Sequence, residues 1–257
     1  MAPTDGLLQG PVSLICGHRV LARTKSDVLL GVLDYVSTGR GAWVLTLNLE
    51  MVSRGRLDRS YRDLVSQADV VLADGVPIVR QSRIKRGAVR IPERVTGSDL
   101  TIELLRECPP EWIAIIGGTE PELALKEAGI DPSVVFVRTG QIAADAATAD
   151  ALAAEIRSHG ARLVLIALGV PKQDRLAVLL KERLPGAVLL GVGGSLDFIA
   201  GVKKRAPKLW QTLGIEWFYR LVTEPRRLAY RYLVVYWVGL FVLVGDAVRS
   251  WFRPRAA

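Results

Sequence analysis

The sequence is poor in the residues that bind transition metals or form disulfides. Its 257 residues include two cysteines, Cys16 and Cys108, and two histidines, His18 and His159. Two cysteines cannot build a disulfide scaffold or a cysteine-based zinc site, and the histidines are too far apart in the chain to show metal-ligand spacing. A transition-metal site built by the protein is therefore not expected, and a reducing, cytoplasmic compartment is the default.

The sequence also lacks a visible targeting or membrane-spanning segment. No charged stretch followed by an apolar run begins the chain, so we expect no secretory signal. An apolar run at residues 232–245 is 14 residues long, whereas a membrane-spanning helix needs about 20. Hydrophobic residues make up 50% of the chain, which allows a sizeable core and excludes wholesale disorder. The length suits one large domain or one and a half.

Positive charge is concentrated at the C-terminal end of the chain. Residues 203–257 contain eleven Lys and Arg against three Asp and Glu. This segment therefore carries the whole net charge of +8, and residues 1–202 are neutral overall. Such a basic segment indicates a nucleic acid or an anionic membrane as the partner.

The apolar run at residues 232–245 lies within this basic segment. Arginines flank it on both sides, and Tyr236, Trp237 and Trp251 add aromatic rings. Basic and aromatic residues around a short apolar helix favour a segment lying in a membrane surface. A core helix or an oligomer contact is the alternative. A nucleic-acid partner is not expected, because Leu and Val offer no stacking surface.

The chain before this segment alternates short apolar strands with amphipathic helices. This alternation predicts an α/β, Rossmann-like fold with a mostly parallel sheet covered by helices on both faces, followed by a basic, partly apolar helical appendage. We expect strands over residues 43–48, 69–73, 112–117, 134–137, 162–168 and 187–192. We expect helices over 26–36 (capped by Thr24), 57–67, 76–85, 97–108, 145–159 and 172–184, and one that begins near Pro121.

Polar residues and glycine-rich turns follow five of the predicted strands. In such folds ligands bind at the carboxyl ends of the strands, and glycine-rich turns that enter helices suit a phosphate. A nucleotide or sugar-nucleotide ligand is therefore favoured. A nicotinamide dinucleotide is not, because Leu196 interrupts the G-x-G-x-x-G pattern, and no P-loop occurs. The residues concerned are Thr46, Asn48, Asp74, residues 117–119, Gly169, Pro171, Lys172, Gln173, Gly193, Gly194, Ser195 and Asp197.

Asp74 is the leading candidate for a general base. It lies between an apolar strand and Gly75, where a carboxylate partly shielded from water can accept a hydroxyl proton. The alternative is that Asp74 caps the following helix, as Asp often does.

Three further residues have two interpretations each. Arg94 could hold a phosphate, or could form a surface ion pair with Glu93 or Asp99. Asp197 could accept a uracil N–H, or could satisfy backbone donors in its turn. Gln173 could bridge substrate hydroxyls, or could be a solvated residue in the first turn of its helix.

An ordered set of motifs along residues 15–231 resembles the WecG/TagA/CpsF family of bacterial glycosyltransferases, which is glycosyltransferase family 26. The most specific part is the series GVGGSLDFIAG, RAP, EW, RL and EPRR. The motifs are TLN at 46–48, ADG at 73–75, ERVTGSDL at 93–100, IIGG at 115–118, LGVPKQD at 168–174, GVGGSLDFIAGVKKRAPKLWQ at 191–211 and GIEWFYRLVTEPRR at 214–227.

The resemblance implies an inverting transfer of a sugar from a UDP-sugar to a polyprenyl-diphosphate-linked saccharide. The enzyme would be of the hexosyl or N-acetylhexosaminyl type and would act as a peripheral or monotopic protein at the cytoplasmic face of the membrane. Its products would feed exopolysaccharide, capsule, teichoic acid or common-antigen synthesis. The division implied is a catalytic core over residues 1–213 and a membrane-associating appendage over residues 214–257.

The resemblance also implies roles for particular residues. The catalytic base matches Asp74, and Asp174 stands where the family usually has Glu. Substrate-binding positions match Thr46, Asn48, Arg94, Gln173, Gly193, Gly194 and Asp197, the last on the nucleotide side. Positions at the acceptor diphosphate and the membrane match Arg220, Arg226, Arg227 and Arg231.

We expect no cofactor and no divalent metal, because no Asp-x-Asp pair is present to hold a metal on the donor diphosphate. The expected partners are the UDP-sugar, the lipid-linked acceptor and an anionic membrane surface. A homo-oligomer that buries the apolar tail away from the membrane is a further possibility. The competing hypotheses are a dinucleotide-dependent oxidoreductase on the same fold class and a nonenzymatic scaffold at the membrane surface.

Overall fold

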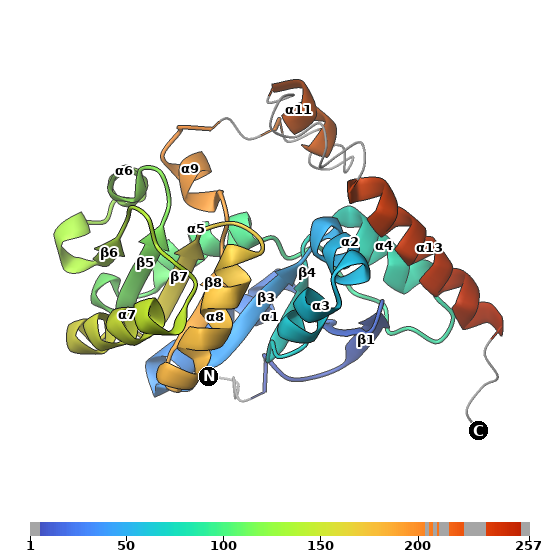
Figure 1. Ribbon diagram of the computed structural model, residues 1–257, viewed down its shortest axis with the longest axis horizontal. Coiled ribbons are helices and arrows are strands. Elements are labelled where there is room, and N and C mark those ends of the chain that lie inside the picture. Colours follow the sequence, from blue (N-terminus) through green and yellow to red (C-terminus); the bar gives the residue numbers. More distant parts are fainter. Residues whose placement is uncertain (1–5, 204–205, 208–209, 211–215, 224–234, 253–257) are drawn as a thin grey trace.

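The computed structural model describes residues 6–203, 206–207, 210, 216–223 and 235–252. An eight-stranded sheet with the order β1-β2-β4-β3-β8-β7-β5-β6 forms its centre (Figure 1). In the described part of the chain only β1 and β2 pair antiparallel, so the predicted mostly parallel sheet is confirmed. The strands are β1 Val12–Ile15, β2 His18–Leu21, β3 Ala42–Leu47, β4 Val70–Ala73, β5 Ile113–Gly117, β6 Phe136–Arg138, β7 Leu163–Ala167 and β8 Val188–Gly191.

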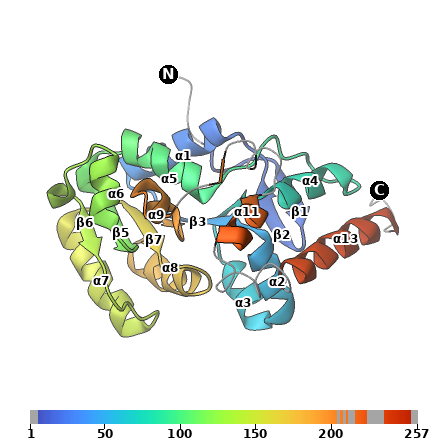
Figure 2. The ribbon, with the colours of Figure 1, turned by 90° about the horizontal axis from the view of Figure 1, so that it is seen from above.

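Helices cover both faces of the sheet (Figure 2). Alternate residues of a central strand face opposite core layers: Leu165 of β7 belongs to the layer of α1, α5 and α6, and Ile166 to that of α2, α3, α7 and α8. The helices are α1 Lys25–Thr38, α2 Leu49–Leu57, α3 Arg59–Val65, α4 Val76–Ile84, α5 Gly97–Glu107, α6 Pro121–Glu127, α7 Ala146–His159, α8 Lys172–Arg183, α9 Ser195–Ile199, α11 Glu216–Thr223, α13 Tyr236–Phe252, and the short 3-10 turns η1 Pro110–Trp112 and η2 Pro132–Val134.

The N-terminus of α1 follows the sequence prediction. Thr24 is the N-cap, and its hydroxyl accepts a hydrogen bond from the Asp27 backbone N–H at 3.1 Å. The Asp27 carboxylate accepts in return from the Thr24 N–H at 3.3 Å, which completes a capping box. The predicted helix over 26–36 is therefore α1, extended to Thr38.

Three features differ from the sequence analysis. The predicted helix over residues 57–67 is α3, which begins at Arg59 because Asp58 caps it, and a separate helix, α2, precedes it. The hairpin of β1 and β2 was not predicted, since its strands are only four residues long and their sequences show no clear alternation of apolar and polar residues. The strand expected over residues 134–137 begins later, at Phe136, because η2 occupies residues 132–134.

The C-terminal helix α13 lies at one end of the sheet, beside α2 and α4 (Figures 1 and 2). Gly239, Leu243 and Ala247 are buried at intervals of four residues, so one stripe of the helix packs on the core. The opposite side carries Phe241 and Phe252, the latter 84% exposed. Among the described residues, every helix is too short or too polar to span a bilayer.

Candidate active site

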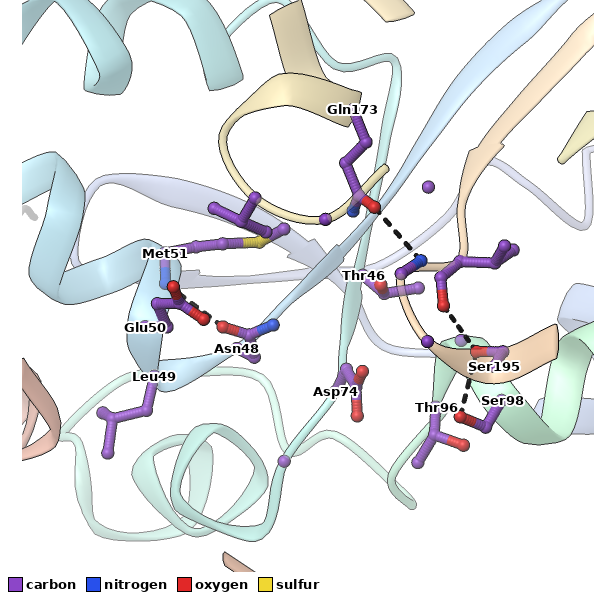
Figure 3. Close-up of a pocket in the computed structure, with 18 of the residues that line it drawn as sticks. Thr46, Asn48, Leu49, Glu50, Met51, Asp74, Thr96, Ser98, Gln173 and Ser195 are labelled. Atoms are coloured by element: carbon purple, nitrogen blue, oxygen red, sulfur yellow. Dashed lines mark hydrogen bonds between the residues drawn. The ribbon is translucent and has the colours of Figure 1, made fainter. Parts of the chain in front are cut away.

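A cavity of about 570 Å³ opens at the carboxyl ends of β3, β4, β7 and β8 (Figure 3). These four strands are neighbours in the sheet, so the residues that follow them converge. The ladder extends to the cavity floor: the Asp74 N–H donates to the Leu47 carbonyl, and the Val192 N–H donates to the Ile166 carbonyl, both at 2.9 Å.

All core residues to which the resemblance assigns a catalytic or substrate-binding role line this cavity. They are Thr46, Asn48, Asp74, Arg94, Gln173, Gly193, Gly194 and Asp197. Of the other candidates after the strands, Gly169 and Ser195 line it too, whereas residues 117–119, Pro171 and Lys172 do not. Of the arginines expected at the acceptor diphosphate, Arg226, Arg227 and Arg231 lie outside the described residues. For Arg220 the structure describes the backbone of α11 and not the side chain.

Asp74 is half-buried at the turn between β4 and α4. The N-cap of α4 is Gly75, with a φ of 144° that favours glycine, and no side chain caps this helix position. Asp74 is therefore not the cap residue of α4. Figure 3 shows its carboxylate between Asn48 on one side and Thr96 on the other.

Thr46 and Asn48 are placed by β3 and by the start of α2. Thr46 is buried near the end of its strand, against Gly97. Asn48 is the N-cap of α2, and its Oδ1 accepts a hydrogen bond from the Met51 N–H at 3.1 Å. The cap fixes the carboxamide at the cavity wall. Glu50, which sequence reasoning missed, lines the same wall from the first turn of α2.

Gln173 is 4% exposed in the first turn of α8, so the interpretation as a solvated residue is wrong. Its Oε1 accepts a hydrogen bond from the Gly193 N–H at 3.1 Å (Figure 3). This bond ties α8 to the loop after β8. The Gln173 side chain also packs closely against Gly191: a Cβ atom added to Gly191 would lie 2.7 Å from the Gln173 Nε2.

The start of α5 contributes the hydroxyls of Thr96 and Ser98, which the sequence analysis did not select as site residues. The Ser98 and Ser195 Oγ atoms are 3.0 Å apart, and the Ser195 hydroxyl donates to the Val192 carbonyl at 2.5 Å. Because the Ser195 proton is used there, Ser98 is the donor to Ser195. Thr96 caps α5 by accepting from the Asp99 N–H at 3.0 Å. That Thr-x-x-Asp spacing was the available signal for this turn.

Asp197 in α9 is buried at the cavity edge and already has two partners. Its Oδ1 accepts from the Thr119 N–H at 3.2 Å, and its Oδ2 pairs with the Lys203 ammonium. Asp197 therefore accepts from a backbone donor, but this donor is Thr119 after β5 and not a residue of its own turn, as the alternative had it. Burial opposes ionisation, but the bonds from Lys203 and Thr119 outweigh it and hold the pKa of Asp197 below its ordinary value.

Lys203 itself lines the cavity, with its Nζ close to the Gly194 turn. Sequence reasoning counted this lysine only as part of the basic C-terminal segment. The helix α13 supplies a further unpredicted wall, made of Tyr236, Trp237 and Leu240. The sequence analysis favours a membrane surface for this segment, because basic and aromatic residues surround its apolar run.

Asp174 lies behind the cavity wall, next to Gln173. It is 1% exposed, and its Oδ2 accepts a hydrogen bond from the Tyr61 hydroxyl at 2.7 Å. Its Oδ1 is buried without a hydrogen-bond partner among the residues that the structure covers. Burial is the largest influence and raises the pKa of Asp174 to about 6, against the opposing bond from Tyr61.

The arrangement combines a half-buried carboxylate, two cations and an apolar wall in one cavity. Asp74 can accept a proton, Arg94 and Lys203 can neutralise a phosphate, and α13 can contact an apolar group. Within the described part of the chain, no group of three or more His, Cys, Asp or Glu residues is arranged to hold a metal ion.

One comparison with known proteins covers nearly the whole chain. The family model described as "Glycosyl transferase WecG/TagA/CpsF family" matches residues 13–256. The match extends from the β1 strand through α13, so it includes every residue of the cavity. The chain therefore belongs to the WecG/TagA/CpsF family, glycosyltransferase family 26, whose members are glycosyltransferases of cell-surface polysaccharide synthesis.

Proposed function

We propose that the protein moves a sugar from a UDP-sugar to a saccharide carried on polyprenyl diphosphate, at the cytoplasmic face of the membrane. The transfer inverts the anomeric centre, and Asp74 is the general base. The observation that supports this best is the cavity itself, which is lined by Asp74, by a polar wall with two cations and by an apolar wall from α13.

The polar wall suits the nucleotide diphosphate of the donor. Arg94 and Lys203 can pair with its phosphates, and the first turn of α5 adds Ser98 and backbone N–H groups. Asp197 can accept the uracil N–H while keeping its present partners, because an ionised carboxylate has about four acceptor sites. Thr46, Asn48 and Gln173 are the groups for the sugar hydroxyls.

The chemistry needs one displacement. The acceptor hydroxyl oxygen attacks the anomeric carbon from the face opposite the UDP oxygen, and the bond to UDP breaks as the new bond forms. The hydroxyl proton passes to Asp74, and UDP leaves with its charge neutralised by Arg94 and Lys203. A single displacement inverts the anomeric carbon. No step requires a divalent metal, so we expect activity to persist in a chelator.

The outer side of α13 suits a membrane surface. Phe241, Val244, Val248, Trp251 and Phe252 are exposed along it. Each basic residue near an anionic leaflet contributes about 1 kcal/mol, so the basic C-terminal segment supports reversible attachment. Flotation with anionic vesicles tests this: Phe241→Ser combined with Phe252→Ser should reduce binding, whereas Leu123→Ser in α6 should not. Equal flotation of the parent protein, the double phenylalanine variant and the Leu123 variant would contradict the proposal.

A donor screen tests the enzymatic proposal. The full chain is mixed with a short-chain lipid-diphosphate saccharide and a panel of UDP-sugars, with GDP- and TDP-sugars as controls, and nucleotide release is followed. We expect release from a UDP-sugar only when acceptor is present, unchanged by EDTA, and a product of inverted anomeric configuration by NMR. Preferential use of a GDP- or TDP-sugar, retention of configuration, or a strict Mn²⁺ requirement would contradict it.

A further inference from the structure

Asp246 is the one acidic residue in residues 232–252, a segment otherwise dominated by apolar and aromatic side chains. A carboxylate in such a helix costs free energy unless it is paired and hydrogen-bonded. Neither the proposed chemistry nor the proposed membrane contact uses a negative charge here. The side chain is mostly buried and lies on the side of α13 that faces α4 and the β1–β2 hairpin.

Three donors from two other elements converge on the Asp246 carboxylate. The Lys85 ammonium lies 2.8 Å from Oδ2 and 3.0 Å from Oδ1. The Cys16 backbone N–H donates to Oδ2 at 3.1 Å, and the Gln81 Nε2 donates to it at 3.4 Å. Against the cost of burial, these donors hold the pKa of Asp246 below its ordinary value.

The donors are themselves fixed by further bonds. Lys85 also donates to the Leu14 carbonyl of β1 at 2.6 Å, and Gln81 donates to the Leu243 carbonyl of α13 at 2.9 Å. Cys16 has a φ of 49° and begins the two-residue turn of the hairpin, which directs its N–H outward. The cluster therefore joins α13, α4 and the hairpin at one point.

This cluster is connected to the cavity through both of its helices. The first turns of α13 carry Tyr236, Trp237 and Leu240, which line the cavity. The helix α4 begins two residues after Asp74 and ends at Ile84, next to Lys85. One end of α4 therefore follows the proposed base, and the other end holds the helix that forms the apolar wall.

We propose that Asp246 is a positioning residue: through Lys85, Gln81 and the Cys16 N–H it clamps α13 to α4, and so keeps Tyr236, Trp237 and Leu240 over the cavity. The identity of the group that these residues contact, the acceptor lipid, rests on the proposed function. The clamp itself does not. Without this clamp, α13 keeps its apolar contacts and the bond from Gln81 to the Leu243 carbonyl, but it loses the bonds from its buried carboxylate to Lys85 and to the Cys16 N–H.

The test uses two variants of the full chain that remove opposite partners, Asp246→Asn and Lys85→Met, and their combination. The matched control is Asp150→Asn, which neutralises a carboxylate paired with Arg183 on the surface of α7. Hydrogen exchange over residues 236–252 is followed together with KM for the donor, KM for the acceptor and kcat. The exchange measurement needs no substrate, so it remains informative if the donor screen fails.

We expect faster exchange in α13 and an acceptor KM raised about tenfold in each single variant, with donor KM and kcat within about twofold. The two effects should not add in the double variant, because both substitutions remove the Lys85–Asp246 ion pair. Asp150→Asn should change none of these. Unchanged exchange in α13, additive effects, or equal increases in both KM values would overturn the proposal, since a residue that only stabilises the fold would not act on one substrate.

Discussion

The two walls of the cavity are held in place by different means. The polar wall comes from loops and helix starts that follow strands or lie beside them, and hydrogen bonds such as Gln173 to Gly193 and Thr119 to Asp197 connect them. The apolar wall comes from α13, which is far away in the sequence. This helix packs against α2 and α4 and is hydrogen-bonded to α4 and to the β1–β2 hairpin. The difference suggests that donor and acceptor binding can be weakened separately.

Asp74 lines the cavity shared by the two walls and is the proposed general base, so its replacement should have the largest effect. We expect Asp74→Asn to reduce transfer about 10³-fold, because general-base catalysis contributes about 10²- to 10⁴-fold. The affinity for the UDP-sugar should change less than about twofold, since the shape of the side chain is kept. Steady-state assays and calorimetry check the two expectations.

The control for this variant is Asp63→Asn, which neutralises an exposed carboxylate of α3. It should leave both measurements unchanged. Near-normal turnover by Asp74→Asn would remove Asp74 from the role of base. A parallel loss of donor affinity would instead place Asp74 in the polar wall.

The sequence was sufficient to predict most of the sheet and the polar residues that follow its strands. Strands such as β7 are buried on both faces, so they appear as continuous apolar runs, and ligands bind beyond their carboxyl ends. For that reason Asp74 and Gln173 could be selected before any coordinates were known. The hairpin and α2 were not predicted, because short elements with mixed polarity leave little periodic signal.

The rest of the site depends on contacts between distant segments. Nothing local to Lys203 shows that its ammonium reaches Asp197 rather than a membrane. Likewise, Tyr236 and Trp237 reach the cavity because distant segments hold α13 on the core, through contacts such as Lys85 with Asp246. The predicted division between residues 213 and 214, and the roles of Arg226, Arg227 and Arg231, remain predictions.

Lys203 offers the next largest effect, confined to the polar wall. We expect Lys203→Met to raise the donor KM about 30-fold, because a hydrogen bond to a charged group contributes about 1.5–3 kcal/mol. The acceptor KM should stay within about twofold. Lys172→Met, at the start of α8, is the control, and it should change neither KM. A larger effect on the acceptor than on the donor would show that the two walls are not separate.

The same variant has a pH dependence with a defined sign. Lys203 helps to depress the pKa of Asp197, so the pair stabilises the fold at neutral pH and loses that contribution as pH falls through this depressed pKa. In Lys203→Met the pKa of Asp197 rises. Urea unfolding should therefore show a smaller loss of stability on acidification than in the parent. An identical pH profile would contradict the pairing.

A matched pair of glycine variants compares the walls directly, with a smaller expected effect. A Cβ on Gly239 would lie 2.5 Å from the Ser53 Oγ and 2.7 Å from the Leu49 carbonyl oxygen, so α13 must move away from α2. We expect Gly239→Ala to cost about 1–3 kcal/mol of stability, as overpacking does, and to raise mainly the acceptor KM.

Gly191→Ala provides the counterpart in the polar wall. The new Cβ meets only the flexible end of Gln173, which can turn away at the expense of its bond to Gly193. We expect a loss of stability of about 1 kcal/mol, typical of one hydrogen bond, and a higher donor KM. Thermal unfolding and separate substrate titrations measure both variants. Interchanged substrate effects would contradict the assignment of the walls.

Tyr61 should have the smallest effect, because it does not line the cavity and contacts Asp174, the neighbour of Gln173. Its hydroxyl is a hydrogen-bond donor to the buried Asp174, beside Gln173, and opposes the rise in the pKa of Asp174 to about 6. A carboxyl whose pKa is above its ordinary 3.8 binds more protons in the folded than in the unfolded chain, so stability falls as pH rises between these values. Removing the hydroxyl raises the pKa further and extends that fall to higher pH.

Tyr61→Phe should therefore lose about 1 kcal/mol of unfolding free energy near pH 5, the usual contribution of one hydrogen bond, and more near pH 7.5. Urea unfolding at the two pH values measures the difference, and Tyr35→Phe, whose ring lies under Arg40, should show no pH-dependent change. The donor KM should rise slightly and the acceptor KM should not. A deficit in Tyr61→Phe that is equal at both pH values would mean that Asp174 does not titrate in this range.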